Sequence, residues 1–109
     1  MKYLITESQL DNVIFRYLDN QDFIQIDNND GIYFVNSESD KYGQIKYYKP
    51  FAICFISREL IEEISSFFSL QESDSEEVIG MWVENTIQMK VTDAGIVDNW
   101  MRYQLRIPN

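Results

Sequence analysis

The chain has 109 residues, 45% hydrophobic and 15% aromatic, which excludes an intrinsically disordered chain and predicts a single folded domain over residues 1–109. Its formal net charge is −9, from 18 acids and 9 bases. This charge disfavours direct binding to nucleic acid, because such binding relies on lysine and arginine to neutralise phosphates.

The charges are unevenly distributed along the chain. Residues 59–84 hold eight acids and no base, whereas residues 41–58 hold four bases and no acid. The longest apolar run has six residues, too few to cross a membrane, and the first residues do not resemble a signal peptide. One cysteine, Cys54, excludes an intramolecular disulfide and fits a reducing compartment.

The first element in the chain is a predicted helix that starts after Thr6. Thr6 and Gln9 match a capping box, and Ile5 and Leu10 match a hydrophobic staple around it. The helix should present one apolar face to the core and end near Asn20. That face consists of Leu10, Val13, Ile14, Tyr17 and Leu18.

A hairpin of two short strands should follow, at residues 22–27 and 32–36. The sequence between them, residues 28–31, is typical of a type I turn that ends with a left-handed glycine, Gly31. The next strand should start near Gln44 and lead through Pro50 into the apolar run Phe51–Ile56. Since proline donates no hydrogen bond, we expect a bulge, a bend or an edge position there.

The run Phe51–Ile56 predicts a central strand that is buried on both faces. Ile53 and Phe55 should share one face, and Cys54 and Ile56 the other. Ser57 should cap the helix that follows, with Ile56 and Ile61 as its staple. The apolar face of this helix consists of Leu60, Ile61, Ile64, Phe67 and Phe68.

A third helix should begin at the capping box of Ser73 and Glu76 and end near Thr86. Its apolar residues are Val78, Ile79, Trp82 and Val83. Residues 88–92 alternate and allow a short strand, with helix as the alternative, and residues 93–95 predict a turn. A last strand is expected where Met101, Tyr103, Leu105 and Ile107 alternate with polar residues.

These elements predict an α+β fold in the order α-β-β-β-α-α-β(β). The expected architecture is an antiparallel sheet of about four strands with three helices gathered on one face.

The residues that common enzymes use are scarce. Without histidine, His-dependent triads and the usual histidine metal sites are excluded. Cys54 lies in the most apolar run, where burial raises a thiol pKa, so we expect a core residue and not a nucleophile. We therefore predict no enzyme, no metal and no cofactor.

Two surfaces remain as candidates for binding. Tyrosines and lysines interleave before the apolar run, and further aromatic and basic residues lie near the C-terminus; both types occur at interfaces. The candidate interaction residues are Tyr42, Lys46, Tyr47, Tyr48, Trp100 and Arg102. The second surface is an acidic face made of Glu59, Glu62, Glu63, Glu72, Asp74, Glu76 and Glu77.

Residues 2–10, Lys-Tyr-Leu-Ile-Thr-Glu-Ser-Gln-Leu, resemble the first residues of small uncharacterised proteins of tailed bacteriophages. The resemblance implies a phage-encoded accessory protein, located in the cytoplasm of an infected bacterium or in the virion. It assigns no functional residue.

The leading hypothesis is a non-enzymatic module that binds a protein partner. The alternative is an acidic inhibitor that imitates nucleic acid and binds a host DNA-binding or defence protein. Association of the chain with itself stays open under both hypotheses.

Overall fold

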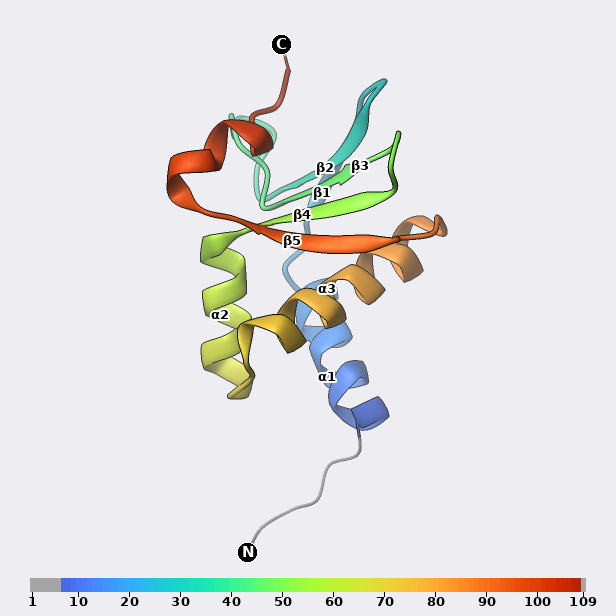
Figure 1. The fold of residues 1–109 in the computed structure, drawn as a ribbon, viewed down its shortest axis with the longest axis vertical. Coiled ribbons are helices and arrows are strands. Elements are labelled where there is room, and N and C mark those ends of the chain that lie inside the picture. The colour runs from blue at the N-terminus through green and yellow to red at the C-terminus, as the bar shows by residue number, and fades with distance from the viewer. Residues whose placement is uncertain (1–6, 109) are drawn as a thin grey trace, which may run out of the picture.

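The computed structural model describes residues 7–108, which form three α-helices, five strands and one 3-10 helix (Figure 1). In chain order the elements are α1 (Glu7–Asp19), β1 (Ile24–Asp27), β2 (Gly31–Val35), β3 (Ile45–Tyr48), β4 (Ile53–Ser57), α2 (Arg58–Phe68), α3 (Glu72–Ile87), β5 (Asp93–Val97) and η1 (Asn99–Leu105).

The five strands form one sheet in the order β1-β2-β3-β4-β5. Neighbouring strands are antiparallel from β1 to β4, but β5 runs parallel to β4, and α2 and α3 form the connection between them. Figure 1 shows α1, α2 and α3 together on one side of the sheet. The predicted α+β class and the helices on one face are confirmed, whereas the sheet is mixed and has five strands instead of about four antiparallel ones.

The first difference arises at Pro50. The chain reverses direction there in a turn that the Ala52 N–H closes on the carbonyl of Lys49, at 3.3 Å. Ala52 has a left-handed backbone, with φ 55°. The predicted bend is therefore a complete turn that separates β3 from β4, and Phe51 lies exposed in it instead of inside a strand.

The second difference concerns the C-terminal part. Residues 93–95 were expected to form a turn and instead begin β5, residues 88–92 contain no strand, and the expected last strand is η1. The small residues of β5 allow α3 to pack closely against this strand. A Cβ placed on Gly80 of α3 would lie only 3.4 Å from the Cβ of Ala94. The alternation after residue 100 does not mark two faces, since Leu105 is buried while Tyr103 is 67% exposed.

Gly31 also differs from the expectation. No glycine among the described residues has a positive φ, so Gly31 does not end the hairpin turn in the left-handed region. It begins β2, where a Cβ would lie only 2.8 Å from the carbonyl oxygen of Tyr47. Glycine is required here because β3 passes too close for any side chain.

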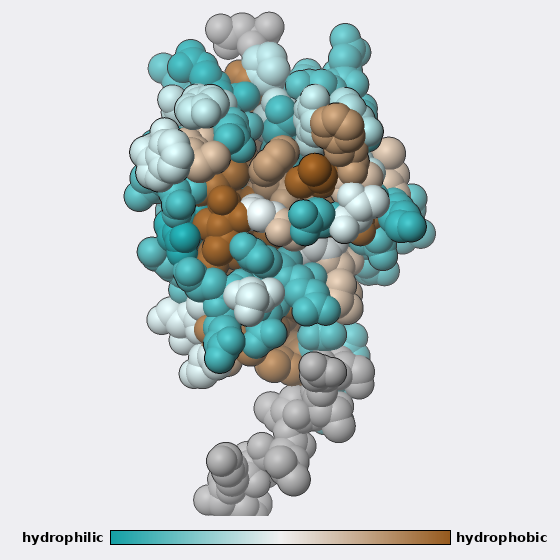
Figure 2. Space-filling view, viewed as in Figure 1, coloured by the Kyte–Doolittle hydropathy of each residue, from teal (hydrophilic) through white to brown (hydrophobic). Residues whose placement is uncertain are grey.

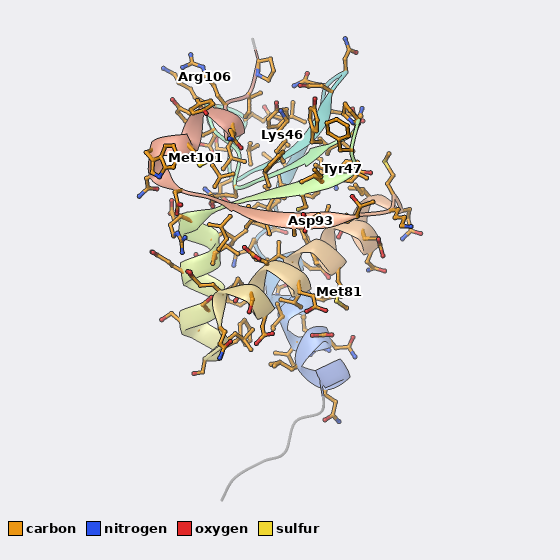
Figure 3. The ribbon with its side chains drawn as sticks, in the orientation of Figure 1. Lys46, Tyr47, Met81, Asp93, Met101 and Arg106 are labelled. Atoms are coloured by element: carbon orange, nitrogen blue, oxygen red, sulfur yellow. The ribbon has the colours of Figure 1, made fainter. Side chains whose placement is uncertain are left out.

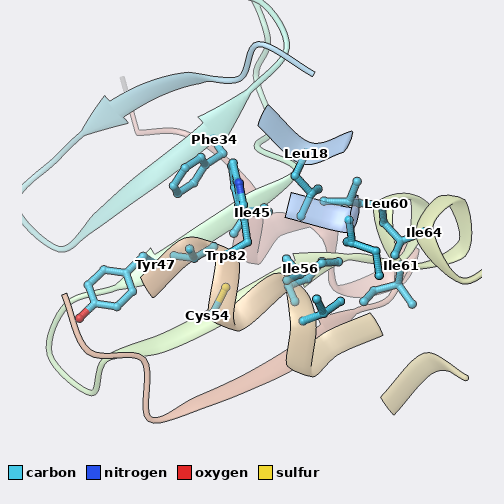
Figure 4. Packing of buried hydrophobic residues seen from close by; sticks show 14 of the residues in the cluster. Leu18, Phe34, Ile45, Tyr47, Cys54, Ile56, Leu60, Ile61, Ile64 and Trp82 are labelled. Carbon is cyan, nitrogen blue, oxygen red and sulfur yellow. The ribbon is translucent and has the colours of Figure 1, made fainter. Parts of the chain in front are cut away.

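The core lies between the helices and the sheet (Figure 4). Ser57 caps α2 as predicted, because its hydroxyl accepts a hydrogen bond from the Leu60 N–H at 3.1 Å. The side chains that fill the core from the helices are Ile14, Leu18, Leu60, Ile61, Ile64, Val78, Ile79, Trp82 and Val83. All nine belong to the apolar faces that the helical spacing predicts.

Two details of the helices differ from the prediction. Val13 is 46% and Phe67 is 66% exposed, so the apolar faces of α1 and α2 are narrower than expected. α3 begins at Glu72, with Gln71 at the cap position, so Ser73 lies inside the helix and forms no capping box. The predicted cap Thr6 and staple residue Ile5 of α1 lie outside the described residues.

Candidate interaction surface

The two sides of the sheet are occupied differently. In β4, Cys54 and Ile56 are fully buried against the helices, whereas Ile53 and Phe55 lie on the other side and are half-buried. The predicted alternation is confirmed, but the expected burial of both faces is wrong.

Figure 1 shows η1 on the side away from the helices, at one end of the sheet. On this side Tyr33 and Val35 of β2 are buried, whereas Tyr48 of β3 is half-buried, as Ile53 and Phe55 are. The accessible part of this side is therefore the region around Tyr48, Ile53 and Phe55. We call this side of the sheet the open face.

An aromatic cluster occupies the open face near the turn between β3 and β4. The ring centroid of Tyr48 lies 5.7 Å from that of Phe51 and 6.4 Å from that of Phe55. Phe51 is 67% exposed, so the cluster is accessible from solvent. We call Tyr48, Phe51 and Phe55 the aromatic patch.

Lys46 borders the aromatic patch on β3. Its amine lies over the rings of Tyr33 and Tyr48, 5.1 Å and 5.3 Å from their centroids, and 3.6 Å from a carboxylate oxygen of Asp30. Burial lowers the pKa of Lys46, but Tyr33 and Asp30 outweigh that effect and hold it above its usual value. The amine is therefore charged and already contacts Asp30 and the rings of Tyr33 and Tyr48. These contacts favour a role for Lys46 in positioning its neighbours over the binding of a phosphate.

Lys49 is engaged in the same way. Its amine donates to Asp27 at 2.6 Å and to the carbonyl of Asn28 at 2.8 Å. Both lysines near the aromatic patch are therefore paired with acids of the hairpin.

The second group of predicted residues lies on and beside η1. The guanidinium carbon of Arg102 lies 4.1 Å from the ring centroid of half-buried Tyr42. Trp100 is 77% exposed, the highest value among the exposed large apolar residues that the structure describes, and Tyr103 is 67% exposed. Trp100 and Arg102 were expected at the outer face of a last strand, and the structure places them on the 3-10 helix η1 instead.

Tyr47 was predicted wrongly as an interaction residue. It is only 3% exposed, points to the helix side of the sheet, and its hydroxyl donates to the carbonyl of Lys90 at 2.9 Å (Figure 4). Adjacent residues of a strand face opposite sides, so Tyr47 and Tyr48 cannot share one surface. Phe51 and Phe55 were missed, although the alternation of β4 already placed Phe55 opposite Cys54.

The predicted acidic face is divided between two helices. Glu59, Glu62 and Glu63 lie exposed on α2, and Glu72, Asp74 and Glu77 lie exposed on α3, while Glu76 is half-buried. Arg58 pairs with Glu72 and, at 2.8 Å, with Asp98. Because these hydrogen bonds stabilise its charged form, the pKa of Arg58 is raised. The carboxylate of Glu63 accepts a hydrogen bond from the Tyr17 hydroxyl at 2.8 Å.

A cleft of about 320 Å³ lies between α3 and β5 and gathers four carboxylates: Glu76, Glu77, Glu84 and Asp93. Burial, together with the charges of Asp93 and Glu72, raises the pKa of Glu76. Asp93 was not predicted to lie near these carboxylates, because residues 93–95 were expected to form a turn. Within residues 7–108, no three acid or thiol groups are close enough together to hold a metal ion.

The side chain of Cys54 lies on the helix side of β4 and is fully buried in the core, as predicted. Burial raises the pKa of its thiol to about 12, so the thiol is protonated at neutral pH.

No protein-family model, curated protein or solved structure matches this chain. Among residues 7–108, no helix has the length and apolar character needed to cross a membrane.

Proposed function

We propose that this protein is a non-enzymatic module that binds another protein through the open face of its sheet. The observation that supports the proposal is the aromatic patch, in which Phe51 is 67% exposed beside Tyr48 and Phe55. Large aromatic side chains are enriched at protein interfaces, where they supply much of the binding energy.

The resemblance of residues 2–10 to phage proteins supports a role as a phage accessory or virion-associated protein. Such a protein acts in the cytoplasm of the infected bacterium or in the particle. Residues 2–10 are not part of the proposed binding surface.

The chain provides a matched pair of substitutions to test this function. Phe51 and Phe67 are 67% and 66% exposed, and each packs with its ring tilted against a neighbouring tyrosine, but they lie on the open face and on α2 respectively. Purified wild-type, Phe51→Ser and Phe67→Ser proteins are immobilised and exposed to lysate of the natural source. We expect wild-type and Phe67→Ser to retain the same partner, and Phe51→Ser to retain it about tenfold less, the loss typical of an interface anchor.

Light scattering of the three proteins after size exclusion detects self-association through the same face. Equal retention by all three proteins, or no retained partner with a monomeric chain, would refute the proposed function.

The acidic cleft supports a second candidate, an inhibitor that imitates nucleic acid. Its observation is the gathering of Glu76, Glu77, Glu84 and Asp93, which concentrates negative charge as a phosphate backbone does. Such an inhibitor should compete with DNA for its partner, with steep dependence on salt. Charge reversal at Glu76 and Glu77 that leaves partner binding unchanged would exclude this function.

A further inference from the structure

The outer edge of β5 has no neighbouring strand in the described structure. β5 is the last strand of the sheet and pairs only with β4. The Ala94 N–H donates to the carboxylate of Asp93 at 2.9 Å, which shows that the backbone of Ala94 faces away from β4. By alternation, the N–H and C=O of Ile96 face the same way. An added extended peptide could pair with the outward carbonyls and the Ile96 N–H of this edge, and it would compete with Asp93 for the Ala94 N–H.

The acidic cleft lies directly beside this edge. Residues from Val91 to Ala94 form one of its walls, and Ser73, Glu76, Glu77, Gly80, Met81 and Glu84 of α3 form the other. Figure 3 shows Asp93 on β5 and Met81 on α3 below it. None of the residues that line the cleft is basic. One oxygen of Glu84 accepts a hydrogen bond from the Val91 N–H at 2.8 Å and so fixes this wall to α3.

The position of the cleft determines which side chains of an added strand it would receive. Successive side chains of a strand point to opposite faces of the sheet. On a strand paired with β5, every second side chain would therefore point to the helix side, into the cleft. The others would point to the open face. Figure 2, which looks onto β5, shows apolar patches interrupted by polar residues across the middle of the molecule.

We propose that the edge of β5 binds an extended segment of a partner protein that carries lysine or arginine at every second position. The backbone of this segment pairs with β5, and its basic side chains meet the carboxylates of the cleft. A second copy of this chain is a poor occupant, because each copy has a net charge of −9 and pairing would bring two acidic clefts together. The site is separate from the aromatic patch.

The test uses a fluorescent seven-residue peptide of alternating lysine and valine, with binding followed by fluorescence polarisation at low salt. Two derivatives carry N-methyl groups on alternate residues, one set on the odd and one on the even positions. Because only every second N–H of an added strand faces β5, one derivative should bind about tenfold more weakly than the other. Equal affinity of the two derivatives would show attraction by charge alone and overturn the proposal.

Matched protein variants test the cleft. Glu76→Gln with Glu77→Gln should weaken binding about tenfold, whereas Glu59→Gln with Glu62→Gln, which removes the same charge from α2, should change it about twofold or less. Phe51→Ser should bind the peptide as wild type does, which distinguishes this site from the aromatic patch. Equal effects of the two double variants, no binding of the peptide, or a dimer that excludes it would each overturn the proposal.

Discussion

At the residue scale, Phe55 and Ile56 are neighbours on β4 with different surroundings. Ile56 is fully buried in the core, whereas Phe55 is half-buried on the open face. Ile56→Ala should lower the free energy of unfolding by about 2–5 kcal/mol, because it leaves a cavity. Phe55→Ala should cost only about 1–2 kcal/mol, because part of that side chain already contacts water. Denaturant unfolding of both variants measures the two losses of unfolding free energy. A larger loss for Phe55→Ala than for Ile56→Ala would mean that the open face is covered.

Cys54 provides a second test of the buried side of β4. Its thiol is fully buried and has a pKa of about 12. A thiol-reactive reagent should therefore label the native protein slowly and the denatured protein fast, since only the thiolate reacts. Native labelling at the rate of a free cysteine would contradict the described packing.

Glu76 should make stability depend on pH. Its pKa lies above the usual 4.5 in the folded protein, because burial and neighbouring carboxylates disfavour the charged form. The folded state therefore binds more protons than the unfolded state just above pH 4.5, and stability falls as the pH rises through the raised pKa.

Glu76→Gln removes this dependence. The variant should melt at a higher temperature than wild type near neutral pH, and the difference should disappear below pH 4.5. Glu62→Gln, at an exposed position of α2, is the control. A stabilisation by Glu76→Gln that does not change with pH would contradict the assignment.

At the element scale, Gly80 stands in the middle of α3 where the helix crosses close to β5. A Cβ at this position would lie 3.4 Å from that of Ala94 and 3.8 Å from a methyl carbon of Val91, which is van der Waals contact. Gly80→Ala should therefore gain the helix propensity of alanine, about 0.5–1 kcal/mol of unfolding free energy. Thermal unfolding checks this, and a destabilised variant would show that the space between α3 and β5 does not admit the added methyl group.

The sequence predicts the elements whose patterns are local. The apolar faces of the helices and the cap at Ser57 follow from spacing and hydrogen-bonding chemistry, and β1 and β2 follow from residue type. β5 does not follow, because small residues that are typical of turns are placed there by the close approach of α3. The exposure of Phe67 does not follow from the sequence either. Its spacing on α2 matches that of the core-facing residues, but its side chain is exposed near the end of the helix.

The candidate site is predictable in part for a related reason. Alternation correctly divides β4 into two sides, and the tyrosine-rich strand does contain the accessible Tyr48. Which side the helices cover depends on the parallel pairing of β5 with β4, which no local pattern indicates. The cleft beside β5 depends on that pairing too, so Asp93 could not be assigned to it from the sequence.

At the scale of the whole molecule, the sheet separates two kinds of surface. The helices close one side over the core, and the other side presents aromatic residues between acid-paired lysines and η1. Eight acids and no base fall in residues 59–84, which include most of α2 and α3 on the helix side of the sheet. The acids nearest the aromatic patch, Asp27 and Asp30, are paired with lysines. The partner binding that we propose for the open face should therefore depend on aromatic contacts more than on charge.

The adjacent residues Tyr47 and Tyr48 test this division of the sheet most directly. In protein labelled with 3-fluorotyrosine, a soluble paramagnetic probe should broaden the fluorine signal of Tyr48 strongly and leave that of Tyr47, which is 3% exposed, nearly unchanged. Single Tyr→Phe substitutions assign the two signals. Equal broadening of both signals, or stronger broadening of Tyr47, would contradict an open face at Tyr48 and a closed core at Tyr47.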